Sequence, residues 1–102
     1  MLRIAIPIKN DKLVDELSNC ENIVIYLVED DNIVLKESRP FRKVNIETLV
    51  RNLQEFRINL LIVSYKNENK RRELNSNKIG VICRNPGDVD EIVKDYVKEL
   101  RN

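Results

Sequence analysis

Five short apolar runs are the dominant pattern of this sequence, and none of them is long enough to form a buried helix. Ile, Val and Leu recur in these runs, which is typical of strands packed inside a sheet. Between the second and third runs, Glu29–Asn32 supplies turn residues that tolerate positive φ, so these two strands should form a hairpin. The predicted strands are Leu2–Ile8, Ile23–Val28, Ile33–Ser38, Leu60–Val63 and Ile79–Cys83.

The segments that flank the hairpin have weaker patterns. Leu13–Glu21 has mixed polarity and no clean period, so we predict a loop there. In the third strand, simple alternation places Ile33 and Leu35 on one face. Pro40 cannot donate a backbone hydrogen bond, and we expect it to end that strand.

Two apolar stripes with helical spacing predict the main helices. The first follows Asn45, whose side chain can cap a helix, and the second follows Asp88, with Glu91 in the capping-box position. Between them, Asn67–Ser76 has only Leu74 as an apolar anchor, so a helix there should lie shallow on the surface. The first stripe is Ile46, Leu49, Val50, Leu53 and Phe56, and the last is Val89, Ile92, Val93, Tyr96, Val97 and Leu100.

The order strand, hairpin, helix, strand, helix, strand, helix is that of an α/β domain. The hairpin forces one antiparallel pair, so we predict a five-stranded mixed sheet, and right-handed crossovers place helices on both of its faces. A length of 102 residues suits one compact domain, and 42% hydrophobic with 34% charged residues is typical of a soluble globular protein. No stretch approaches the roughly 20 apolar residues of a membrane span, so we expect no membrane contact.

Composition excludes several kinds of chemistry. The chain contains no histidine, which rules out Ser-His-Asp and Cys-His nucleophile pairs, a histidine base and any histidine-ligated metal. Its two glycines, Gly80 and Gly87, cannot form a glycine-rich phosphate loop. A net charge of +1 provides no general field for attracting nucleic acid. We therefore expect a protein that is not an enzyme and does not bind nucleic acid.

The two cysteines are too far apart in sequence for a C-x-x-C motif, and we expect both to be reduced thiols in a cytoplasmic protein. Cys20 lies in the predicted loop before the second strand, where its thiolate could bind a metal or the edge of an iron–sulfur cluster. The alternative is a small, half-buried loop residue. Cys83 ends the last strand and is expected to belong to the core.

Two groups of polar residues are further binding candidates. Arg42 and Lys43 belong to a basic linker before the first helix, where they could hold an anionic cluster, a phosphate or an acidic partner. Ser64, Lys66 and Asn67 follow the fourth strand, and open α/β sheets commonly bind ligands at the carboxyl ends of their strands. The alternative for the basic linker is a solvated connection between a strand and a helix. The alternative for Ser64, Lys66 and Asn67 is an ordinary surface turn.

Four stretches in this order resemble the dinitrogenase iron-molybdenum cofactor biosynthesis family of small NifX-like and NafY-like domains. They are Leu2–Pro7, Ile23–Ile33, Ile58–Val63 and Pro86–Ile92, and the resemblance covers nearly the whole chain. It implies a ribonuclease H-like three-layer domain over residues 1–102, with the first strand central in the sheet. It also implies a non-catalytic cytoplasmic protein that carries or binds an iron–molybdenum or related iron–sulfur cofactor.

The ligand motifs of that family are altered here. Leu17–Cys20 stands where the family has His-Phe-Gly, and Ser64–Asn67 stands where it has a glycine pair. We therefore predict a degenerate site in which Cys20 is the one soft, metal-binding ligand. Arg42, Lys43 and Lys66 would hold the cofactor by charge, and Ser64 and Asn67 would be further cofactor-binding residues. Two other functions stay open: a protein-interaction module that has lost cofactor binding, and an enzyme acting on a small anionic metabolite with Lys66 or Arg42 as electrophile.

Overall fold

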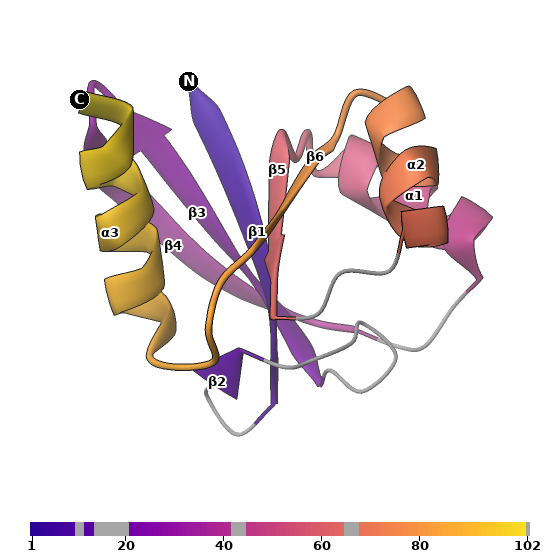
Figure 1. Ribbon diagram of the computed structural model, residues 1–102, viewed down its shortest axis with the longest axis horizontal. Helices are drawn as coiled ribbons and strands as arrows, with labels where there is room; N and C mark the ends of the chain where they lie inside the picture. The colour runs from indigo at the N-terminus through magenta and orange to yellow at the C-terminus, as the bar shows by residue number, and fades with distance from the viewer. Residues whose placement is uncertain (10–11, 14–20, 42–44, 65–67, 102) are drawn as a thin grey trace.

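A computed structural model describes residues 1–9, 12–13, 21–41, 45–64 and 68–101 (Figure 1). Six strands and three helices lie in these ranges. The strands are β1 (Leu2–Lys9), β2 (Lys12–Leu13), β3 (Asn22–Glu29), β4 (Asn32–Pro40), β5 (Leu60–Val63) and β6 (Gly80–Cys83). The helices are α1 (Ile46–Glu55), α2 (Glu68–Ser76) and α3 (Val89–Arg101).

The predicted five-stranded mixed sheet is confirmed, with the first strand at its centre. The strand order is β4-β3-β1-β5-β6. β3 is antiparallel to both β1 and β4, whereas β5 is parallel to both β1 and β6. A sixth, two-residue strand pairs with the end of β1 through Ile8↔Leu13 and Lys9↔Lys12. The prediction of a loop from Leu13 onward is therefore wrong at Leu13, because the chain turns back onto β1 immediately after leaving it.

Helices cover both faces of the sheet, α3 on one face and α1 with α2 on the other (Figure 1). Each face has its own buried cluster, because alternate residues of each strand point to opposite faces. The predicted stripes of α1 and α3 point into these clusters, except that Leu100 in the last turn of α3 is 48% exposed. The α3 cluster is Ile4, Ile6, Ile8, Val24, Tyr26, Val28, Leu60, Ile62, Val89, Ile92, Val93 and Val97. The other is Ala5, Ile23, Ile25, Leu49, Val50, Leu53, Ile58, Leu61, Val63, Leu74 and Ile79.

The edge strand β4 departs from prediction in two ways. It runs through Pro40 instead of ending before it, which a strand at the edge of a sheet tolerates. A register shift pairs Ile33 with Val28 but Leu35 with Leu27, so one extra residue bulges from β4. Ile33 therefore packs toward α3, while Leu35 lies on the opposite face and is 55% exposed.

The predicted helix starts are confirmed by their caps. The Asn45 side chain accepts a hydrogen bond from the backbone N–H of Thr48 at 2.8 Å, and the Asp88 carboxylate accepts one from Glu91 N–H at 3.1 Å. α2 is anchored by Leu74, which is 1% exposed, as its sparse pattern predicts. No helix within the described ranges is long and apolar enough to cross a membrane.

Candidate functional site

The sequence singles out six binding residues, of which Ser64 is described by the structure. The other five, Cys20, Arg42, Lys43, Lys66 and Asn67, lie outside the described residues. Ser64 directly follows β5 and is half-buried.

Ser64 lines a hollow of about 230 Å³ together with Cys83, Arg84 and Asn85. These residues meet because β5 and β6 are parallel neighbours, and Val63 pairs with Cys83 at their carboxyl ends. Beyond that pair, the backbone N–H of Arg84 donates to the carbonyl oxygen of Val63 at 2.9 Å, which continues the pairing by one residue. The hollow thus lies at the strand ends where open α/β sheets commonly bind ligands.

Three contacts fix the orientation of Arg84. Its Nη1 donates to the carbonyl oxygen of Cys83 at 2.9 Å, and its Nη2 donates to Oε2 of Glu99 at 2.6 Å. Its guanidinium carbon also lies 5.9 Å from the ring centre of Tyr96. Glu99 and Tyr96 both belong to α3, so this helix fixes the guanidinium group on its own side of the sheet, while Arg84 also lines the hollow. A guanidinium has five N–H donors, which leaves several for an anionic ligand.

Cys83 has a free thiol that is half-buried, which confirms for this residue the prediction of a reduced cysteine. Its side chain packs against the α1 and α2 cluster, as expected for a core position, and it also lines the hollow. A thiolate is a soft ligand suited to iron–sulfur clusters. Among the described residues, no three Cys, Asp or Glu side chains lie close enough to hold a metal ion together.

Cys83 and Arg84 were not among the binding residues predicted from the sequence. The signal that could have identified them is the rule that drew attention to Ser64. β6 was expected to follow a crossover from β5, so its carboxyl end should lie beside that of β5 at the same edge of the sheet.

A second polar cluster joins the N-terminus of α3 to the sheet. The Tyr26 hydroxyl donates to Oδ1 of Asp90 at 2.6 Å, and Nζ of Lys36 lies 3.0 Å from the same oxygen. Burial raises the pKa of Tyr26 above its ordinary value, and the hydrogen bond to the negatively charged Asp90 raises it further. The hydrogen bonds from Tyr26 and Lys36 lower the pKa of Asp90. This cluster keeps the tyrosine neutral and the aspartate ionised, and its role is to attach α3.

No protein-family model matches the sequence, and no curated protein matches it. Solved structures do match in fold. The protein PH0822 superimposes with a TM-score of 0.86 at 15% identity, over 96% of this chain and 90% of that one. A protein of Methanocaldococcus jannaschii, MJ0327, provisionally described as a dinitrogenase, gives 0.78 at 18% identity over 96% and 89%. A Thermotoga protein, TM1290, provisionally described as a NifB protein of the DUF35 family, gives 0.71 at 24% identity over 99% and 90%.

These likenesses extend over nearly the full length of both partners in each comparison. At such identities they establish a shared fold, because fold is retained long after function has diverged. The resemblance inferred from the sequence is thereby confirmed at the level of the fold.

Proposed function

We propose that this chain is a small, non-catalytic domain of the NifX-like type, with the ribonuclease H-like three-layer arrangement, that carries an iron–molybdenum or related iron–sulfur cofactor. The observation that carries the proposal is the half-buried free thiol of Cys83 in a hollow that Ser64 and Arg84 also line, at the carboxyl ends of parallel strands. Support for the cofactor class comes from the fold, which is shared with proteins provisionally described as a dinitrogenase and as NifB.

The residues of the hollow suit a cluster that is held briefly. The Cys83 thiolate can bind one iron atom, and the uncommitted N–H groups of Arg84 can donate to the anionic cluster. The hollow measures about 230 Å³, less than the roughly 300–1,000 Å³ of ordinary small-molecule pockets, so a cluster bound there would protrude into solvent. One ligand and an open position favour transfer to another protein over permanent retention.

A carrier needs no acid–base group, and the sequence supplies no histidine for one. Cys20 and the basic residues Arg42, Lys43 and Lys66, together with Asn67, remain predicted contributors to the same cofactor. The alternative predicted from the sequence, an interaction module that has lost cofactor binding, requires neither cysteine. The cofactor carrier therefore requires a cysteine thiol for its function, whereas the interaction module does not.

Anaerobic reconstitution with ferrous iron and sulfide, followed by visible absorption, tests the proposal. We expect the wild-type chain to develop an iron–sulfur chromophore and Cys83→Ser to lose most of it. Cys20→Ser removes the other predicted thiol ligand, and we expect it to lower the chromophore less than Cys83→Ser does. Circular dichroism before reconstitution establishes that each variant is folded. No chromophore in the folded wild type, or an equal chromophore in both variants, would contradict the proposal, and the former result favours the interaction module.

A further inference from the structure

Within the part of the chain that the structure describes, β4 is one of the two edge strands of the sheet. It pairs with β3 on one side, and no described strand pairs with its other side. The strand has nine residues, of which Val34 and Leu35 are more than half exposed. Alternate backbone N–H and C=O groups along such an edge point outward, where a further strand can bind them.

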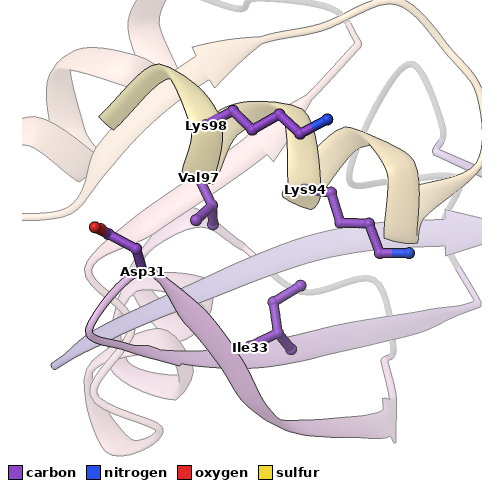
Figure 2. A pocket seen from close by; sticks show the side chains of 5 residues that line it. All are labelled: Asp31, Ile33, Lys94, Val97 and Lys98. Atoms are coloured by element: carbon purple, nitrogen blue, oxygen red, sulfur yellow. The ribbon is translucent and has the colours of Figure 1, made fainter. Parts of the chain in front are cut away.

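Two hollows lie along the seam between β4 and α3. The first, about 190 Å³, has an apolar floor of Ile33 and Val97, with Lys94, Lys98 and Asp31 around it (Figure 2). Lys94 and Lys98 extend from consecutive turns of α3 in the same direction, while Val97 and Ile33 occupy the space between helix and strand (Figure 2). Among the described residues, Lys94 has a long, exposed contact with Glu91 at 3.9 Å and its charge also acts on Asp90, whereas Lys98 pairs with none of them. Two ammonium groups against one carboxylate make this hollow positive.

The second hollow, about 310 Å³, lies further along the same seam. Its floor is formed by the buried side chains of Ile8, Val24 and Val89. Its walls carry Lys36 and Ser38 from β4, Asp88, which caps α3, and Asp90 from α3. Two carboxylates against one ammonium group make this hollow negative. An apolar floor below acidic walls suits the aliphatic stem and charged head of a lysine or arginine side chain.

From these features we infer that the β4–α3 seam is a docking groove for an extended peptide of a partner protein, which adds a strand to β4. The first hollow is lined by Ile33 and the second by Ser38, whose partners on β3, Val28 and Val24, are four residues apart, which is about 13 Å along a strand and corresponds to peptide residues four positions apart. Such residues lie on the same face of the peptide, so both can point toward α3. If the peptide runs antiparallel to β4, its basic residue comes first and its acidic residue follows four residues later.

The opposite charges of the two hollows select a peptide that carries one basic and one acidic residue as the occupant. A second copy of the chain is the other candidate: a symmetric antiparallel pair of β4 strands centred on Lys36 or on Glu37 brings like charges together at its centre, whereas one centred between them places Lys36 opposite Glu37. The inference is independent of the proposed cofactor function, because the seam and the Cys83 hollow share no residue.

The probe is a pair of fluorescent nine-residue peptides rich in Thr and Val, one with Lys and Glu four positions apart in that order and one with the two exchanged. Fluorescence anisotropy measures affinity, and amide chemical shifts in the ¹⁵N-labelled full chain map the contact. We expect the Lys-first peptide to bind at least tenfold more tightly than the exchanged peptide. The largest shifts should fall in β4 and the exposed side of α3.

Reversing two charges tests the recognition directly. Lys94→Glu combined with Lys98→Glu should weaken binding of the Lys-first peptide at least tenfold. A peptide with Lys in place of Glu should bind this double variant with the original affinity. Arg72→Glu reverses an exposed charge on α2 and is the matched control. It should change the affinity for neither of these two peptides. Failure of the Lys-first peptide to bind at millimolar concentration, shifts centred on another surface, or a concentration-dependent dimer that occupies β4 would each overturn the inference.

Discussion

Removing the hydroxyl of Tyr26 tests how α3 is attached to the sheet. Tyr26 is 1% exposed and donates to Asp90 at 2.6 Å, so Tyr26→Phe removes one hydrogen bond without opening a cavity. A hydrogen bond to a charged partner contributes about 1.5–3 kcal/mol. The Asp90 side chain is 47% exposed and water can replace part of what it loses, so we expect a cost at the low end, about 1.5 kcal/mol.

The assay is urea unfolding of the wild type, Tyr26→Phe, Asp90→Ala and the double variant. With a slope of about 1.5 kcal/mol per molar urea, Tyr26→Phe should lower the midpoint by about 1 M. The double-mutant cycle should give a coupling energy of about 1–2 kcal/mol, from which any separate effect of Asp90 on the helix cancels. Tyr96→Phe is the matched control, since its hydroxyl bonds none of the described residues, and it should cost less than about 0.5 kcal/mol.

The coupling should also depend on pH. The folded-state pKa of Asp90 is lowered by its bonds to Tyr26 and Lys36, whereas an unfolded aspartate has a pKa of about 3.9. Stability from the ionised carboxylate is therefore present above about pH 4 and is lost as the pH falls through the folded-state pKa. A coupling below about 0.3 kcal/mol at neutral pH, or one that increases as the pH falls below about 4, would refute this account of the cluster.

Three further outcomes are expected. Leu53→Ala should cost about 2–4 kcal/mol in urea unfolding because Leu53 is 1% exposed, and Leu100→Ala should cost less than about 0.5 kcal/mol; equal costs would contradict the assigned packing. Asn45→Ala should cost about 1 kcal/mol through loss of the cap on α1, and an unchanged midpoint would argue against that cap. Thiol titration should find two thiols per denatured chain, with Cys83 reacting in the native state; a count of zero in a monomer would require a bond between Cys20 and Cys83.

Most of the fold follows from local patterns in the sequence. Runs such as Leu60–Val63 are too short for helices and too apolar for loops, so strands were predictable, and the bounds of β5 match the prediction. The helix starts were equally predictable, because the Asn45 and Asp88 side chains accept hydrogen bonds from backbone N–H groups only three residues away. The bulge in β4 was not predictable, since it arises from the register between Leu27 and Leu35 and leaves no mark on alternation within one strand.

The candidate site was only partly predictable. Ser64 was identified from its place after a strand, but the hollow around it depends on two strands meeting at one edge. The orientation of Arg84 depends on Glu99, fifteen residues away on α3, and no local pattern links the two. The pattern of a single segment therefore identifies Ser64. It does not identify Cys83 and Arg84, which tertiary packing brings to the same hollow.

The most direct test of the central proposal is anaerobic titration of the chain with isolated iron–molybdenum cofactor at low and high salt. Exposed charge contacts contribute about 0–1 kcal/mol each, so charge alone gives millimolar binding or weaker. The Cys83 thiolate must supply the rest of the binding free energy. We predict reversible binding to the wild type that weakens in high salt and is lost in Cys83→Ser. Submicromolar binding that survives both Cys83→Ser and high salt would contradict the account and move the site elsewhere.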